Sequence, residues 1–161
     1  MQTHRSKKSA SKSSSRPADT DATAADSTGW LSASLAHRRA RTVAAVLTGV
    51  CGVVALVSAT AKLTNQAAVV ELLDRVEVHG LLRDLLPFIQ IAGGVGALGS
   101  LIRFARLGVA ALAGLALYFT GAVIAHLRVG DGIGDIAVPI EYVIVMSATA
   151  ALRRATLDND A

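Results

Sequence analysis

The sequence predicts an all-α membrane protein: a four-helix transmembrane bundle with a short amphipathic surface helix between helices 1 and 2. The main observation is a set of four long apolar runs, of which only the last contains a charged side chain, Glu141. Each run has about the 17–25 residues that a helix needs to cross a bilayer. Barrel strands would alternate apolar and polar residues, and these runs do not. The runs are residues 42–61, 85–102, 107–125 and 136–152.

Composition supports one membrane-embedded domain. The chain has 161 residues, 52% of them hydrophobic, and its mean hydropathy is +0.49. Backbone groups inside hydrocarbon must be hydrogen-bonded within their own segment, which favours helices. We therefore expect the lipid bilayer as the main surroundings, with helices at about 40–62, 85–103, 106–127 and 136–153. The expected domains are a disordered basic and polar tail (1–35), the four-helix domain (36–157) and a C-terminal tail (158–161).

The first helix follows a polar N-terminal segment. Residues 1–29 are rich in Ser, Ala, Thr and Asp, a composition that buries too little apolar surface to fold. Trp30 follows at a plausible depth for an interfacial anchor. The first apolar run exceeds the ~7–15 residues of a signal-peptide core, so a retained membrane helix is expected. Cys51 is the one cysteine, which excludes dithiol chemistry within this chain.

The connection between the first two membrane helices contains a short amphipathic segment. Apolar residues recur at helical spacing within 69–76, while Glu71, Asp74 and Arg75 occupy the opposite face. This pattern predicts a short helix at the membrane surface or over the end of the bundle. Gly80 is expected to end it.

The second and third helices are joined by a very short connection, 103–106, and should be antiparallel neighbours. Pro87 and Pro139 are expected near the starts of the second and fourth helices, where a missing N–H costs little. The spacing of Gly94, Gly96 and Gly99 matches a dinucleotide-binding fingerprint, but no strand precedes it. Inside an apolar helix, a strip of small residues instead predicts close helix packing: Gly93, Gly96, Ala97 and Ser100.

Basic residues alternate between the two sides of the predicted membrane. Arginines precede the first run, separate the second from the third, and follow the fourth, whereas the other two connections mix both signs. The positive-inside rule then places both termini in the cytoplasm. The net charge of +4 indicates topology and not nucleic-acid binding, because no aromatic-rich basic surface accompanies it.

Five polar residues near the outer ends of the helices form the predicted ligand site. A carboxylate inside a membrane helix costs about 2.5–3.5 kcal/mol on insertion scales, so Glu141 is expected to face the bundle and to have a partner. Lys62, His126 and Arg128 are the candidate partners, and Gln90 should lie at the same depth. The predicted ligand-binding residues are Lys62, Gln90, His126, Arg128 and Glu141.

Two interpretations of this polar level remain open. The functional one is a small pocket that hydrogen-bonds a quinone-like carbonyl or relays a proton. The structural one is a satisfied polar cluster that fixes helix order, with Lys62 and Arg128 extending to the interface. No metal site is expected, since the spacing of His126, Asp131, Asp135 and Glu141 matches no familiar one. Haem is not expected either, because no axial pair of histidines lies within the helices.

Three stretches resemble the DoxX-like membrane proteins over about residues 42–154. Residues 58–63 (SATAKL) are similar to the end of that family's first helix, 86–99 (LPFIQIAGGVGALG) to its second, and 121–131 (GAVIAHLRVGD) to the third and its exit. Lys62, His126, Arg128 and Asp131 match the family pattern, whereas many relatives carry Glu where this chain has Gln90. Glutamine does not titrate, so the resemblance implies no proton role for that position here.

The resemblance implies a multi-pass protein of the bacterial cytoplasmic membrane, associated with quinone-linked or thiol-linked oxidoreductases. The expected role is an accessory subunit with a small polar pocket near the outer face, for which quinone is the candidate ligand. The chain has no intrinsic cofactor or electron carrier, so it is not expected to catalyse a redox reaction without a membrane or peripheral oxidoreductase partner. Two alternatives remain: a small transporter or proton-coupled permease that uses Glu141, and a structural assembly partner with no ligand.

Overall fold

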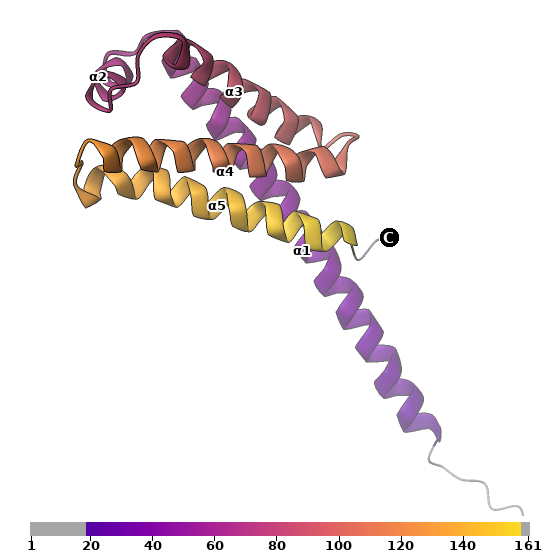
Figure 1. The fold of residues 1–161 in the computed structure, drawn as a ribbon. Helices are drawn as coiled ribbons and strands as arrows, with labels where there is room; N and C mark the ends of the chain where they lie inside the picture. The colour runs from indigo at the N-terminus through magenta and orange to yellow at the C-terminus, as the bar shows by residue number, and fades with distance from the viewer. Residues whose placement is uncertain (1–18, 159–161) are drawn as a thin grey trace, which may run out of the picture. The chain divides into compact units, whose positions relative to one another are not determined.

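The computed structural model describes the backbone of residues 19–158 and the side chains of residues 32–158. This part of the chain is all-helical, as predicted, and contains no strand (Figure 1). Four of its helices are long and apolar enough to cross a membrane: Ser32–Leu63 within the first, and the third, fourth and fifth over their full lengths. The helices are α1 (Asp19–Leu63), α2 (Ala67–Arg75), α3 (Gly80–Gly99), α4 (Ala105–Arg128) and α5 (Ile133–Asp158).

Helix α1 begins well before residue 40, where the sequence predicted its start. Disorder was wrongly predicted for 19–35, while residues 1–18 and 159–161 lie outside the described range. The segment after Pro17 contains several alanines, the best helix formers, and adding turns to an existing apolar helix costs less than nucleating a new one. The chain divides into two compact units after Ala36, and every site described below lies in the second, from His37 onward.

The surface helix predicted between the first two membrane helices is α2, which runs from Ala67 to Arg75. Gly80 does not end it, contrary to the prediction. The chain leaves the helix at Val76, and Glu77 takes a positive φ of 57°. Gly80 begins α3, also with a positive φ, 60°, a backbone conformation that costs glycine little. Helix α3 therefore starts about one turn earlier than expected, and Pro87 lies inside it.

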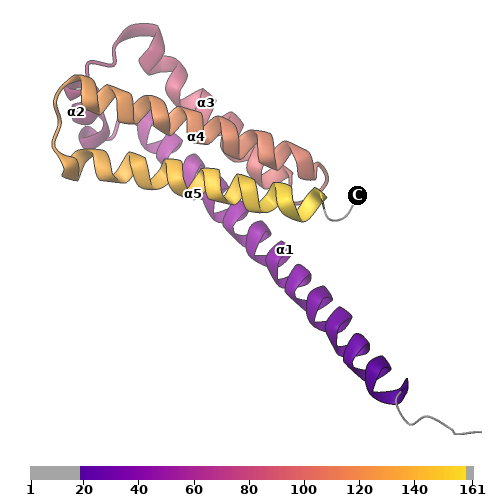
Figure 2. The ribbon, with the colours of Figure 1, turned by 60° about the horizontal axis from the view of Figure 1, so that its bottom comes forward.

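Helices α4 and α5 lie side by side and antiparallel in both views (Figures 1 and 2). Helix α3 packs on α4, as the short turn between them requires. Small and aliphatic side chains of α1, α4 and α5 form the buried core, with Phe119 as its aromatic member. Three partly buried residues pack against this core: Tyr118, Tyr142 and Val143.

Glycines let α1 and α3 approach closely. A Cβ on Gly94 would lie 2.9 Å from the carbonyl oxygen of Gly52, and one on Gly52 would lie 3.1 Å from the carbonyl oxygen of Gly94. Side chains there would push the two backbones apart, which is the usual reason for small residues between membrane helices. Gly94 lies in the interior of α3, away from any strand. On the α4 side, a Cβ on Gly93 would lie 2.6 Å from Leu115 and one on Gly96 would lie 3.1 Å from Ala111, so the predicted close packing is confirmed at these two glycines.

The contacts between connections define two ends of the bundle. At the end that we call the polar end, Arg128 at the end of α4 donates to the backbone oxygen of Val76, and Arg75 pairs with Asp135. At the other, which we call the arginine end, Arg153 of α5 donates to carbonyl oxygens around the α3–α4 turn. The predicted ligand residues and the α3–α4 arginines thus lie at opposite ends, as expected.

Candidate functional site

Lys62 lies in the last turn of α1 and points into the bundle, where it is half-buried. Its ammonium donates to Ser58 Oγ at 3.0 Å and to the Ser58 carbonyl oxygen at 3.4 Å, one turn earlier in the same helix. It also donates to Gln90 Oε1 of α3 at 3.0 Å. The aliphatic stem crosses apolar surface, and the charge is held by neutral oxygens without a carboxylate.

The Gln90 side chain is fully buried, and one half of its amide has no partner. A lysine ammonium can only donate, so the amide must turn its oxygen toward Lys62. The Nε2 group then faces away, and among the described residues it is the one buried side-chain nitrogen or oxygen without a hydrogen bond. A buried donor without an acceptor costs about 1–3 kcal/mol. The arrangement is therefore suited to a further acceptor.

A cavity of about 190 Å³ lies next to Lys62, between the end of α1, helix α2 and the first turns of α3. Its lining includes Arg83, which pairs with Asp74 at 2.6 Å, and Pro87. Because Pro87 has no N–H, the carbonyl of Arg83 has no helical donor four residues later. Gln90 lies one turn below Pro87 and does not line the cavity, so Lys62 is the direct link between the two.

Aromatic rings lie close to the Lys62 ammonium. Its Nζ is 5.9 Å from the centre of the Tyr118 ring, within the range of a cation–π contact. Tyr118 meets Phe119 edge to face, with ring centres 5.1 Å apart, and Phe119 lies 4.7 Å from Tyr142. These rings provide a flat apolar neighbour to a cationic donor at this depth of the bundle.

His126 and Asp131 form a second, separate polar pair. The imidazole Nδ1 lies 2.6 Å from Asp131 Oδ2, and the two side chains are only 7% and 12% exposed. A carboxylate partner makes Nδ1 the donor, which leaves Nε2 of the neutral ring as an acceptor. Tyr118 lies eight residues before His126 in α4, or about 12 Å along the helix, so this pair is nearer the polar end than Lys62.

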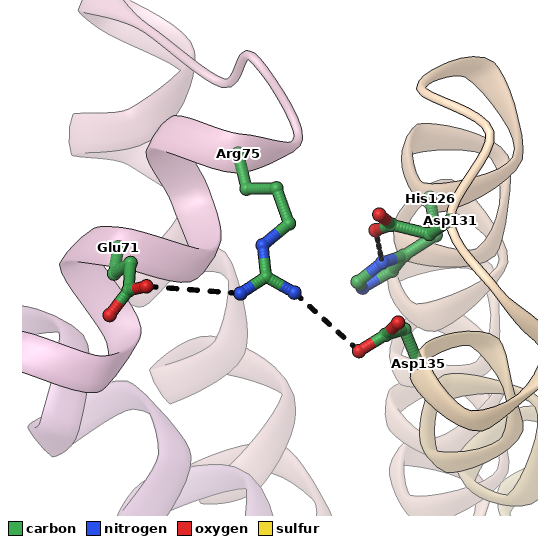
Figure 3. Close-up of polar contacts among 5 residues, drawn as sticks. All are labelled: Glu71, Arg75, His126, Asp131 and Asp135. Atoms are coloured by element: carbon green, nitrogen blue, oxygen red, sulfur yellow. Dashed lines mark hydrogen bonds and ion pairs between the residues drawn. The ribbon is translucent and has the colours of Figure 1, made fainter.

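Ion pairs of α2 and α5 lie beside the His126–Asp131 pair (Figure 3). Arg75 of α2 lies between Glu71, at 3.9 Å, and Asp135 of α5, at 3.6 Å. Figure 3 shows the imidazole on the side of the helices that faces Arg75. Arg128 is exposed and pairs with Glu77 at 3.5 Å. It therefore holds the α2–α3 connection against α4.

Glu141 does not face the bundle, contrary to the prediction. Its side chain is exposed on α5, and it takes part in no hydrogen bond or ion pair with another described residue. The expected partners are engaged elsewhere: Lys62 with Gln90, His126 with Asp131, and Arg128 with Glu77. Spacing along the sequence gave the depth of Glu141 correctly but not the side of the helix on which it lies.

The structure thus joins two of the five predicted ligand residues, Lys62 and Gln90, and gives the other three different surroundings. Sequence reasoning missed Ser58 and Tyr118 as neighbours of Lys62. Ser58 could have been found, because it lies four residues before Lys62 on the same helix face. Tyr118 carried no such signal. In the part of the chain that the structure describes, no three His, Cys, Asp or Glu residues gather as metal ligands would.

Comparison with known families gives a match over most of the bundle. A family model described as the DoxX-like family matches residues 46–150, which contain the Lys62–Gln90 contact and the His126–Asp131 pair. Neither the curated proteins nor the solved structures gave a match. Together with the four apolar helices, this makes the chain a multi-pass membrane protein. The chain belongs to the DoxX-like family.

Proposed function

We propose that this chain is an accessory subunit of a membrane redox system and that it holds a quinone-type carbonyl group at Lys62 and Gln90. The observation that carries the proposal is the Lys62 ammonium, a cationic donor that lines the cavity and is held there by the buried Gln90 amide oxygen. A carbonyl oxygen supplies two acceptor lone pairs and no donor, which is the complement of this donor. A ligand hydroxyl or amine would fit less well, because its hydrogens would face further donors.

The size and lining of the adjacent cavity agree with a flat ring. Its volume of about 190 Å³ is below the roughly 300–1,000 Å³ of pockets for drug-sized ligands, so a single small ring system is the appropriate scale. Phe88 and Val69 line the cavity beside Lys62. An apolar tail of such a ligand could extend into lipid past the exposed side chains of α3.

Proton transfer is the second part of the proposed chemistry. Reduction of a quinone takes up protons, and reoxidation of the quinol releases them. In the His126–Asp131 pair a carboxylate orients the imidazole ring, which is the arrangement used by general bases. Electrons must come from a partner oxidoreductase, since the side chains of this chain provide no electron carrier. Within this proposal the membrane is the bacterial cytoplasmic membrane and both termini are cytoplasmic.

The test is the binding of a small quinone, menadione, to the purified full-length protein in detergent, measured by equilibrium dialysis. Lys62→Met removes the donor and Gln90→Leu removes the oxygen that positions it, and each change should weaken binding by roughly tenfold, the value of one net hydrogen bond. Arg128→Gln is the matched control, because it removes a cation at the same end that does not line the cavity. Its binding should stay close to that of the unmodified protein.

Two results would contradict the proposal. If menadione does not bind, or if the Lys62 and Gln90 variants bind it as well as the unmodified chain does, the polar pair only fixes helix order. A structural assembly role would then be the better account. The transporter alternative has lost its argument from Glu141, because that carboxylate lies on the outer surface of α5.

A further inference from the structure

A second cavity, of about 250 Å³, lies at the arginine end of the bundle, remote from the polar end. Its walls come from α1, the α3–α4 turn and the last turns of α5. Three arginines line it, one from each of these segments, and none of the other lining residues is acidic. The three are Arg41, Arg103 and Arg153.

Arg153 is a built-in part of this cavity. Arg153 is only 7% exposed. Its guanidinium donates through Nη2 to the Ser100 carbonyl oxygen at 2.9 Å and through Nε to the Ala105 carbonyl oxygen at 3.3 Å. Neither bond uses Nη1. Gly108 makes room for the group: a Cβ there would lie 2.8 Å from Arg153 Nε and closer still to the Ser100 hydroxyl. The chain thus fixes a cation at the cavity wall by backbone contacts alone.

The hydroxyl groups of the cavity lining donate their hydrogen bonds to backbone carbonyl oxygens, and neither of them is paired with the Arg153 guanidinium. Ser100 donates to the Ala97 carbonyl oxygen at 2.6 Å, and Thr156 donates to the Arg153 carbonyl oxygen at 2.8 Å. Asp158, the nearest acid along α5, pairs with Arg154 outside the cavity. Guanidinium groups bind phosphate oxygens in a planar, bidentate way, so three of them around one cavity are suited to a phosphate group.

The rim of the cavity distinguishes a lipid phosphate from a free one. Leu101, Ile102 and Leu157 belong to its lining, and Ile102 is 90% exposed. Phe104, next to the cavity, is also exposed. A free phosphate ion gains nothing from apolar surface at this position, whereas the acyl chains of a phospholipid would cover it. Basic pockets at the membrane surface between helices are a recurrent way of binding acidic lipid headgroups.

We propose that this cavity binds the phosphate group of an anionic phospholipid, with Arg41, Arg103 and Arg153 around the phosphate and the acyl chains along Leu101 and Ile102. The site is independent of the quinone proposal, since it lies at the other end of the bundle and shares no residue with the first cavity. A lipid bound there would join α1, the α3–α4 turn and α5 at the membrane surface.

The experiment compares two double variants of the full-length protein that each remove two arginines from the same end. Arg41→Gln with Arg103→Gln removes two cavity arginines, whereas Arg38→Gln with Arg106→Gln removes two exposed ones outside the cavity. Arg153 is left unchanged, because its loss would also disturb the α3–α4 turn. Phosphatidylglycerol bound to each protein is titrated by native mass spectrometry against a phosphatidylcholine background, and helix content is checked by circular dichroism.

The proposal predicts that phosphatidylglycerol binds in preference to phosphatidylcholine. Binding should fall by roughly thirtyfold in the cavity variant, from about 1 kcal/mol for each of the two arginines removed, and should change little in the control. Equal losses in both variants, or no loss in either, would overturn the proposal. In a third arm, inorganic phosphate should not displace the lipid at an equal concentration. If it does, the cavity is a site for the free anion and the lipid assignment is wrong.

Discussion

Lys62 is the residue on which the proposed quinone site depends, and its surroundings follow from helix geometry. Ser58 lies one turn earlier and supplies two oxygens, while Gln90 supplies a third from α3. All three oxygens are neutral, so none of them forms an ion pair with the ammonium. A glutamate in place of Gln90 would form an ion pair with Lys62 and would remove the amide donor.

Gly94 offers a residue-scale test of the packing between α1 and α3. Ala at this position would bring a Cβ to 2.9 Å from the Gly52 carbonyl oxygen and equally close to Leu56. Backbone cannot move away as a flexible side chain can, so we expect Gly94→Ala to destabilise the bundle by about 1–3 kcal/mol. Denaturant unfolding in detergent micelles, followed by circular dichroism, measures the change.

Gly114 of α4 is the matched control for this substitution. A Cβ on Gly114 would meet nothing within 4 Å, and alanine has the higher helix propensity by about 1 kcal/mol. Gly114→Ala should therefore be neutral or stabilising. If Gly94→Ala were equally well tolerated, the close approach of the two helices would not be a requirement of the fold.

The sequence predicted how deep a polar residue lies along its helix. It did not predict which side of the helix faces the bundle, because neighbouring helices determine that. The sequence placed Lys62 and Gln90 at one depth, and the structure joins them. It also placed Glu141 at that depth, but assigned it to the interior on energetic grounds. The exposed position of Glu141 shows that the side of α5 facing the core is set by Ile136, Met146 and their neighbours, which the core requires.

At the scale of helices and turns, Arg153 joins α5 to the α3–α4 turn. One bond satisfies the carbonyl oxygen of Ser100, which the end of α3 leaves without a helical donor, and the other reaches the carbonyl oxygen of Ala105 at the start of α4. Arg153→Gln should therefore destabilise the protein by about 2 kcal/mol or more, since hydrogen bonds from a charged group are worth about 1.5–3 kcal/mol. Thermal unfolding in detergent is the measurement.

Arg154 is the control for that change, because it is the next residue in α5 and is exposed. Its partner, Asp158, lies on the same helix at 3.7 Å. Arg154→Gln should change stability by no more than about 0.5 kcal/mol. Equal effects of the two substitutions would mean that net charge at this end, and not the carbonyl contacts of Arg153, stabilises the turn.

The Arg75–Asp135 pair connects the surface helix α2 to the start of α5. Its atoms are 3.6 Å apart and both side chains are about half exposed, at 47%. A pair of this kind contributes about 0.2–1 kcal/mol. A double-mutant cycle with Arg75→Gln and Asp135→Asn should give a coupling energy in that range, and it should fall when salt is added. A coupling of several kcal/mol would mean that the pair is shielded from solvent in the membrane.

Element boundaries were predictable where composition changes sharply and less so elsewhere. The limits of α4 agree closely with the prediction, because Arg106 and Arg128 border its apolar run. The start of α1 was missed. No proline lies between Asp19 and the apolar run, and the one glycine there, Gly29, does not interrupt the helix. Gly80 was assigned to the wrong element because a glycine with positive φ can end one helix or begin the next.

At the scale of the whole molecule, the two ends of the bundle have different chemistry. Acidic and basic side chains pair at the polar end, among α2, α4 and α5, and the Lys62–Gln90 donors lie beneath them. Arginines predominate at the other end. The sequence predicted this asymmetry from the alternation of its charged connections, because four apolar helices leave charged residues only at their ends. The hydrogen bonds within each end depend on how the helices pack, so the pattern of charged connections in the sequence did not predict them.

The central claim is that the chain crosses the membrane four times, so that these two ends lie on opposite sides. Cysteine labelling in intact cells tests it most directly, in a Cys51→Ala background. Gly132→Cys in the α4–α5 connection should react with a membrane-impermeant maleimide added outside. Arg106→Cys at the start of α4 should react only after the membrane is permeabilised. Reaction of both cysteines from the same side would contradict the four-pass bundle and the assignment of its two ends.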